Sequence, residues 1–169
     1  MDILVVSDTH GRTDRLEAVL ERTRADMVFF LGDGLRDLHA IPTQLTVRAV
    51  RGNCDFFGRE NTPEVRVETV GAYRFFLTHG HRYEVKRGIT VAVQAAALAD
   101  ADVLLYGHTH RPHIAYLAAD SAVGSVVLKK PMIVFCPGSL GEPQGEKPSF
   151  GMLTVRNNGV LPSLSELPW

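Results

Sequence analysis

Short apolar runs alternate with segments of helical period in the first half of the chain. Leu16, Val19 and Leu20 fall on one face of a predicted helix, as expected for a helix that packs against a sheet. Asp14 and Glu17 offer a capping box near the start of this helix. Continuous aliphatic and β-branched runs predict buried strands at residues 3–6, 27–31 and 46–50. This part of the chain is therefore predicted to alternate strands with helices.

Strand-like runs dominate the remainder of the chain. Residues 64–70 and 73–78 flank Gly71-Ala72 and predict a β-hairpin, whereas residues 88–99 are rich in Ala and Val and predict a helix. Glycines within residues 141–146 predict a mobile loop. Further strands are predicted at residues 103–106, 114–118, 123–128, 132–135 and 150–155. Helices early and strands late predict an α/β fold, a layered sandwich of two sheets flanked by helices.

The composition restricts the class of protein. With 169 residues, of which 45% are hydrophobic and 22% charged, the chain suits a single globular domain over residues 1–169. A formal net charge of -1 gives no general electrostatic reason to expect specific nucleic-acid or membrane binding. Two cysteines without CxxC spacing are too few for a disulfide framework, and the first residues lack both a basic leader and a long apolar run. We therefore expect a cytoplasmic protein made without a signal peptide.

Polar clusters stand at the ends of several of the apolar runs. They are Asp8-Thr9-His10, Gly32-Asp33-Gly34, Gly52-Asn53-Cys54-Asp55, Thr78-His79-Gly80-His81 and Gly107-His108-Thr109-His110. Aspartate, asparagine and histidine side chains provide oxygen and nitrogen ligands for a divalent metal. Because loops that follow strands can meet at one edge of a sheet, segments distant in sequence can converge on one pocket. The clusters together predict a metal site.

Each cluster also has a simpler interpretation when it is taken singly. Asp8 and Thr9 could cap the following helix, and Asp33 could belong only to a turn. Asn53 could be a left-handed turn residue without a ligand role, and the histidines could be hydrogen-bonded near the surface. Six of the seven histidines nevertheless lie in or beside these loops, which capping and turn preferences do not require. His39 is the exception, and we expect it at the surface near a short helix.

The order of the motifs DxH, GD, GNxD, THG and GHTH resembles the calcineurin-like metallophosphoesterase superfamily. The short chain and its GNCD motif are similar to the small bacterial and archaeal phosphodiesterase branch of that superfamily. The resemblance covers nearly the whole chain and implies a β-sandwich flanked by helices, with two metal ions near the strand ends. It also implies the ligands of each metal. Asp8, His10 and His110 would hold the first metal, Asn53, His79 and His108 the second, and Asp33 would bridge both.

The chemistry of these residues agrees with that implication. A carboxylate such as Asp33 has two oxygens and can hold two ions about 3.5–4 Å apart, as in two-metal hydrolytic sites. Two divalent metals would attract a phosphate and favour a bridging hydroxide, which would attack the phosphoester. The mixed nitrogen and oxygen ligands suit Mn, Fe, Ni, Co or Zn better than Mg or Ca. Manganese is our first expectation, because the similar branch often uses it.

One position departs from the pattern of many superfamily members. Cys54 follows the asparagine where those proteins carry a histidine that acts on the leaving oxygen. A thiol is a poor substitute, since a neighbouring metal favours thiolate, which has no proton to donate. His81 or water would then serve the leaving oxygen, so Asp33, Asn53 and His81 are the catalytic candidates. Asp55 could orient this loop or could simply be a turn residue.

The resemblance, together with the absence of an obvious proton donor, implies a metal-dependent phosphodiesterase that acts on a small phosphoester substrate. Within the same class, a phosphomonoesterase or a dinucleotide-polyphosphate hydrolase is the alternative. From a different class, a protein-binding scaffold is possible, since a eukaryotic retromer subunit shares this small fold. The presence of all seven ligand positions argues against a scaffold, and a metal sensor or store would not need open coordination sites. The sequence leaves the native substrate, the resident metal and a possible homo-oligomer undecided.

Overall fold

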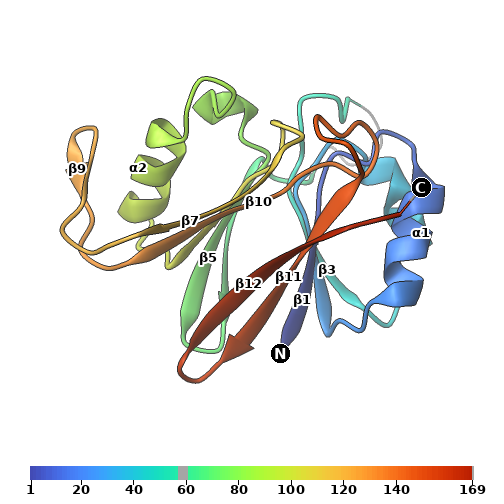
Figure 1. The fold of residues 1–169 in the computed structure, drawn as a ribbon, viewed down its shortest axis with the longest axis horizontal. Helices are drawn as coiled ribbons and strands as arrows, with labels where there is room; N and C mark the ends of the chain where they lie inside the picture. The colour runs from blue at the N-terminus through green and yellow to red at the C-terminus, as the bar shows by residue number, and fades with distance from the viewer. Residues whose placement is uncertain (57–60, 169) are drawn as a thin grey trace.

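Two five-stranded mixed sheets pack face to face in the computed structural model, which describes residues 1–56 and 61–168 (Figure 1). The first sheet has the order β12-β11-β1-β2-β3 and the second the order β4-β5-β6-β10-β7. The strands of the first sheet are β1 (Asp2–Val6), β2 (Met27–Phe30), β3 (Thr46–Ala49), β11 (Ser149–Arg156) and β12 (Gly159–Glu166). Those of the second are β4 (Val65–Val70), β5 (Tyr73–Thr78), β6 (Val103–Leu105), β7 (Pro112–Leu117) and β10 (Met132–Pro137).

Helices cover the outer face of each sheet, so the fold has four layers (Figure 1). The helical elements are α1 (Thr13–Arg22), α2 (Thr90–Leu98) and the short 3₁₀ helices η1 (Leu35–Ala40) and η2 (His81–Tyr83). A small hairpin of β8 (Ala122–Val123) and β9 (Val126–Val127) projects beyond α2. The predicted α/β sandwich of two sheets flanked by helices is confirmed.

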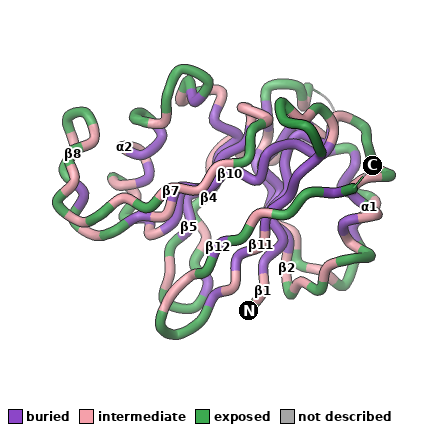
Figure 2. Tube along the Cα trace, viewed as in Figure 1, coloured by how far each residue is buried: buried purple, intermediate pink, exposed green. Residues whose placement is uncertain are grey.

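Burial on both faces explains why the central strands are continuous apolar runs. Alternate residues of β1, such as Ile3 and Val5, point between the sheets and share a cluster with Phe75 of the opposite sheet. Their neighbours Leu4 and Val6 point outward into a second cluster beneath α1. A third cluster joins the outer face of the other sheet to α2. Figure 2 shows the buried positions concentrated in the central strands and exposure in the outer loops.

Parallel pairing brings the functional loops to one edge of the sandwich. Strands β1, β2 and β3 are parallel neighbours, and so are β5, β6 and β10. Their carboxyl ends therefore point the same way within each sheet, where loops commonly form binding sites. The polar clusters predicted from the sequence all follow these strands.

Two local predictions were wrong, and one strand was not predicted. The capping box is absent, because α1 follows Arg12 without a side-chain cap, and the carboxylate of Asp14 instead binds the Arg12 guanidinium at 2.8 Å. The strand predicted at residues 123–128 is divided between β8 and β9 by a turn at Gly124, whose φ is 57°. Strand β12 was not predicted, because Pro162 and alternating polar residues obscure it, and it pairs with β11 at the edge of the sheet.

Candidate metal centre

Asp8, His10 and His110 form the first of two adjoining ligand groups. Asp8 and His10 follow β1, and His110 follows β6 of the opposite sheet. The Nε2 atom of His110 lies 3.1 Å from Asp8 Oδ1, and that of His10 lies 3.8 Å from the same oxygen. One donor atom from each of the three residues lies within 4.8 Å of the others. The sandwich therefore brings together residues that are about 100 positions apart.

The second group consists of Asp33, His79 and His108, whose donor atoms also lie within 4.8 Å of one another. Asp33 Oδ2 lies 3.3 Å from His79 Nε2 and 3.9 Å from His10 Nε2, so this carboxylate lies between the two groups. The amide oxygen of Asn53 lies 3.1 Å from His79 Nε2 and is at the exposed side of the centre. All seven residues predicted as ligands thus lie at one place.

Close contact between the strand-end loops explains two glycines of the motifs. A Cβ atom at Gly52 would lie only 2.6 Å from the backbone nitrogen of Asp33. A Cβ at Gly107 would overlap the Ser7 side chain and lie 2.9 Å from Asp8 Oδ2. The GN and GH motifs therefore contain glycine because other ligand loops approach their backbones.

Left-handed backbone is concentrated at the proposed ligands. Among the described residues, eight non-glycine positions have positive φ, and five of them are ligand candidates. These five are Asp8, His10, Asp33, His108 and His110. Such a conformation costs roughly 1–2 kcal/mol per residue and tends to occur where surrounding structure and function impose it. Hydrogen bonds between the loops hold it, including Asp8 N to Gly32 O at 2.9 Å and His10 N to Asp33 O at 3.1 Å.

Backbone carbonyls fix the orientation of two histidine rings. His79 Nδ1 donates to Leu31 O at 2.7 Å, and His110 Nδ1 donates to Glu142 O at 2.6 Å. Because a carbonyl only accepts, each neutral ring carries its proton on Nδ1 and directs the lone pair of Nε2 at the carboxylates. Metal-binding histidines typically have this arrangement.

The donor atoms fit a bound cation. Asp8 Oδ2 accepts hydrogen bonds from Ser7 Oγ at 2.5 Å and His108 N at 3.0 Å, but buried Asp8 Oδ1 has no hydrogen-bond partner among the described residues. In neutral His110 the lone pair of Nε2 faces this oxygen, an unfavourable contact unless a positive charge lies between them. A proton can supply that charge: protonated His110 would donate to Asp8, and this interaction raises the pKa of His110, against the effect of burial. A divalent metal can replace the proton.

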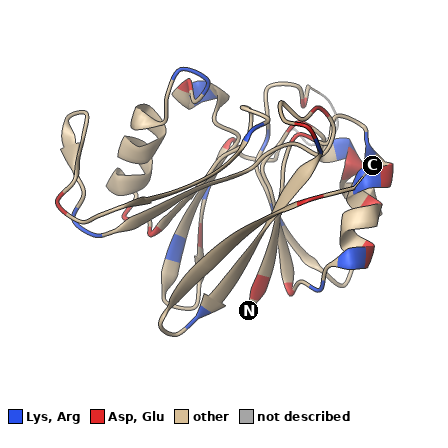
Figure 3. Cartoon of the chain, in the orientation of Figure 1, with Lys and Arg blue, Asp and Glu red and all other residues tan. Residues whose placement is uncertain are grey.

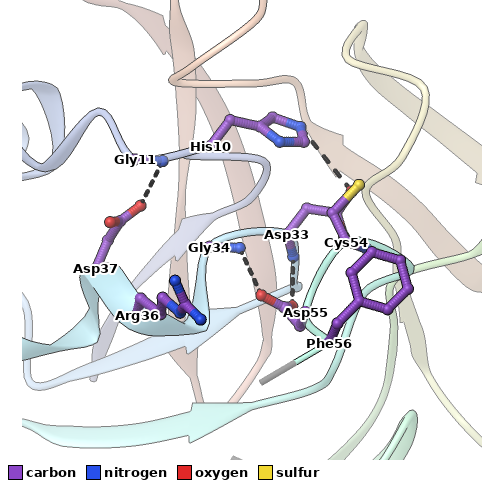
Figure 4. A pocket seen from close by; sticks show the side chains of 9 residues that line it. All are labelled: His10, Gly11, Asp33, Gly34, Arg36, Asp37, Cys54, Asp55 and Phe56. Atoms are coloured by element: carbon purple, nitrogen blue, oxygen red, sulfur yellow. Dashed lines mark hydrogen bonds and ion pairs between the residues drawn. The ribbon is translucent and has the colours of Figure 1, made fainter. Parts of the chain in front are cut away.

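Asp55 organises the loops that carry Asp33 and Asn53. Its Oδ2 accepts backbone N–H groups of Asp33 at 2.8 Å and Gly52 at 2.9 Å, and its Oδ1 accepts those of Gly34 and Leu35, both at 2.9 Å (Figure 4). Of the two interpretations left open for Asp55, these hydrogen bonds agree with the orienting role. The carboxylate of Asp33 is itself held by the backbone N–H of Cys54 at 2.7 Å.

Asp37 performs a similar task that the sequence analysis missed. This buried carboxylate accepts hydrogen bonds from Thr9 Oγ1 at 2.5 Å, Gly11 N at 3.0 Å and Thr13 Oγ1 at 3.2 Å. It ties η1 to the loop that carries Asp8 and His10. Its sequence surroundings resemble an ordinary exposed helical turn, so no local signal distinguishes it.

Cys54 lies at the mouth of the centre without a clear acidic role. Its Sγ atom lies within 4.8 Å of donor atoms of His10 and Asp33. Burial and the neighbouring Asp33 raise the pKa of the Cys54 thiol to about 11. In the metal-free protein the thiol is therefore a weak acid that stays protonated near neutral pH.

Two further histidines lie outside the two ligand groups. The His81 ring is half-buried, with its centroid 5.5 Å from that of His79 and 6.2 Å from that of His108. Burial, and then the charge of His79, lower the pKa of His81. His39 is exposed on η1, where its Nδ1 lies 2.6 Å from Arg36 O. The surface position predicted for His39 near a short helix is confirmed.

Two cavities open at the centre. The first, of about 410 Å³, is lined by His10, Asp33 and Cys54 and by the exposed ring of Phe56 (Figure 4). The second, of about 920 Å³, extends from His110 toward the loop that precedes α2. The loop at residues 141–146 borders this second cavity and is joined to the centre by Gln144 N to His110 O at 3.0 Å. Its predicted mobility stays a prediction.

No helix in the described part of the chain combines the length and hydrophobicity that a membrane span requires.

Known proteins with similar sequences have related descriptions. A probable metallophosphoesterase of Bacillus subtilis, YsnB, is 30% identical over 164 residues, which are 95% of this chain and 88% of that protein. The Escherichia coli phosphodiesterase YfcE is 31% identical over an alignment of 187 residues that covers 95% of this chain and 90% of YfcE.

Solved structures with the same architecture include a predicted phosphoesterase from Streptococcus pneumoniae TIGR4. It has a TM-score of 0.75 and 25% sequence identity, and the match covers 98% of this chain and 88% of that one. Vps29 of Chaetomium thermophilum has a TM-score of 0.72 at 19% identity, with 99% and 98% covered, which establishes a shared fold only.

The family comparison covers most of the chain and agrees with the order of its motifs. The model of the calcineurin-like phosphoesterase superfamily domain matches residues 1–158, which include every ligand candidate described above. The chain therefore belongs to the calcineurin-like phosphoesterase superfamily.

Proposed function

We propose that the protein is a metal-dependent phosphodiesterase with a binuclear metal centre. The observation that carries this proposal is the position of Asp33, whose Oδ2 is within 3.9 Å of His10 Nε2 and 3.3 Å of His79 Nε2. A carboxylate between two groups of histidines is suited to bridge two cations. The relationship to a phosphodiesterase of Escherichia coli supports diesters as the substrate class.

We assign seven residues to two metal positions. Asp8, His10 and His110 hold the first cation, Asn53, His79 and His108 hold the second, and Asp33 contributes to both. Divalent transition metals at these positions would polarise a water molecule and draw the phosphoryl oxygens into place. The mixed nitrogen and oxygen ligand set suits Mn, Fe, Ni, Co or Zn. Manganese is our first assignment, because the branch that the motifs resemble often uses it.

The chain's own groups orient the metals and the substrate. The carbonyls of Leu31 and Glu142 hold the rings of His79 and His110, and Asp55 holds the backbone on either side of Asp33. We assign His81 to the leaving oxygen as a hydrogen-bond donor. This imidazole is not a ligand, its ring lies against those of His79 and His108, and Cys54 is a weak acid.

The alternatives differ in substrate or in class. A phosphomonoesterase or dinucleotide-polyphosphate hydrolase would use the same metals but would prefer a dianionic phosphate or an anhydride. A scaffold would use the surface of the fold without needing the centre, and the similarity to Vps29 supports only the shared fold. The complete ligand set, with a buried Asp8 oxygen that no described residue hydrogen-bonds, favours an enzyme. We also propose one domain over residues 1–169 and a cytoplasmic location, with which free Cys54 and Cys136 agree.

Turnover of bis(4-nitrophenyl) phosphate with and without added Mn²⁺ tests the proposal. We expect metal-dependent hydrolysis by the wild type, its loss in His108→Ala, and wild-type rates in the control His39→Ala. A 4-nitrophenyl monoester assayed in parallel tests the preference for diesters. Absence of hydrolysis with each of the five metals, in protein shown to bind them, would favour the scaffold instead.

A further inference from the structure

The second cavity beside the metal centre has the properties of a binding groove for part of the substrate. It has a volume of about 920 Å³ and shares His110 with the centre. Its walls come from the loop before α2 and from the segment that follows His110. We call it the cationic groove and define it by Lys86, Tyr106, Arg111 and His113. A substrate bound at the metals could therefore extend one ester arm into it.

Two basic side chains in this groove have no acidic partner in the described part of the chain. Neither the Lys86 ammonium nor the Arg111 guanidinium makes a salt bridge with any residue in ranges 1–56 and 61–168. The nearby Glu84 carboxylate pairs with Arg87 at 3.2 Å instead. Glu142 is the one acidic residue that lines the groove, so the groove carries a surplus of positive charge. Figure 3 shows basic positions on the loop that leads into α2.

Lys86 and Arg111 line the same cavity as His110, which belongs to the metal centre. Both charges can therefore act on a ligand that occupies the centre and the groove together.

A hydrogen-bonded pair provides a neutral donor in the same groove. The hydroxyl of Tyr106 and Nδ1 of His113 are 3.1 Å apart. If the hydroxyl donates to Nδ1, neutral His113 retains an N–H on Nε2. If Nδ1 donates to the hydroxyl oxygen, Tyr106 retains its O–H. In either arrangement the pair keeps one donor for an anionic oxygen, while Val85, Ile89 and Pro112 supply apolar surface for the connecting chain.

We propose that the cationic groove binds a second anionic group of the substrate, on the ester arm that extends past His110. This inference rests on the proposed phosphodiesterase function and narrows its substrate class to diesters with a terminal phosphate or similar anion on one arm. Lys86 and Arg111 provide the charge, and the pair of Tyr106 and His113 provides a directed hydrogen bond. The scissile phosphate would remain at the metal centre.

Binding of unreactive ligands tests the groove without requiring turnover. Calorimetry of the zinc-loaded protein would compare alkane bisphosphonates of increasing chain length with alkylphosphonates of the same length. We expect the best bisphosphonate to bind about tenfold more tightly than the alkylphosphonate of the same length. This gain exceeds the statistical advantage of a ligand with two equivalent ends. The double variant Lys86→Gln/Arg111→Gln should lose this gain. Lys129→Gln, which removes an exposed lysine between β9 and β10, should retain it.

A matched kinetic comparison connects the groove to the substrate. Two 4-nitrophenyl diesters would carry the same alkyl arm, ending in a hydroxyl or in a phosphonate. We expect the double variant to raise KM for the anionic arm about tenfold and to leave kcat and the neutral-arm ester unchanged. No preference for the second anion in the wild type at any arm length, or a preference that survives in the double variant, would overturn the inference. Failure to hydrolyse either diester would instead count against the proposed function, and the calorimetry would still decide the groove.

Discussion

Replacing Asp55 by asparagine tests whether one carboxylate organises the metal centre through the backbone. Asp55 is not itself a proposed metal ligand. Its two carboxylate oxygens accept four backbone N–H groups, one of which belongs to the ligand residue Asp33. Asparagine has nearly the same shape, so it leaves the volume of the site unchanged. It keeps one acceptor oxygen and places an NH₂ group at the other position.

The geometry fixes the expected magnitude. Oδ1 and Oδ2 each accept two N–H groups, so either orientation of an amide leaves two backbone donors facing an N–H₂ group. A hydrogen bond to a charged group contributes about 1.5–3 kcal/mol, and the lower value applies because Asp55 is half-exposed. Losing two such bonds should destabilise the protein by about 3 kcal/mol. At roughly 2–4 °C per kcal/mol for a chain of this size, Tm should fall by about 6–12 °C.

Thermal denaturation followed by circular dichroism, with elemental analysis of bound metal, measures both consequences. We expect Asp55→Asn to lower Tm and to reduce metal content, since the loops that carry Asp33 and Asn53 lose their shared anchor. Asp120→Asn is a matched control, because Asp120 is exposed and its φ of 63° suits asparagine. A wild-type Tm and full metal content in Asp55→Asn would refute the reasoning.

Three further predictions concern the centre itself. Asp33→Asn should reduce total metal content more than Asp8→Asn, because an amide lacks the charge that brings two cations together; equal and undiminished content by elemental analysis would exclude the bridge. Lowering the pH through about 6.5 should release metal, because protons compete for the histidine nitrogens. In the metal-free protein, acidification should instead favour the folded state through His110. Asp8 raises the pKa of His110, so this pair stabilises the fold below about pH 6.5, and the stabilisation is lost as pH rises. Tm measured against pH, with and without metal, would distinguish the two effects. Cys54→Ala should leave the dependence of kcat/KM on leaving-group pKa as steep as in the wild type, because burial and Asp33 keep the thiol a weak acid. A steeper dependence in the variant would show that the thiol donates a proton to the leaving oxygen.

The sequence by itself determined the elements whose signal is local. The runs at residues 3–6 and 27–31 lie in central strands because both faces are buried, which produces an uninterrupted apolar pattern. The motifs at Asp8, Asp33 and His79 were visible because each loop directly follows such a strand. Edge strand β12 gave no comparable signal, since it is exposed along much of its length and contains Pro162.

Only the tertiary structure decided which side chains meet. Asp37 has the sequence surroundings of an ordinary surface acid, yet it is buried and holds Thr9, 28 residues away. The cationic groove likewise unites Lys86 with Arg111, which belong to segments on opposite sides of α2 and β6. Local periodicity reports how deeply a residue is buried, but it carries no information about contacts between distant loops. Those contacts are set by strand order and sheet packing, and they determine both the support of the metal ligands and the shape of the groove beside them.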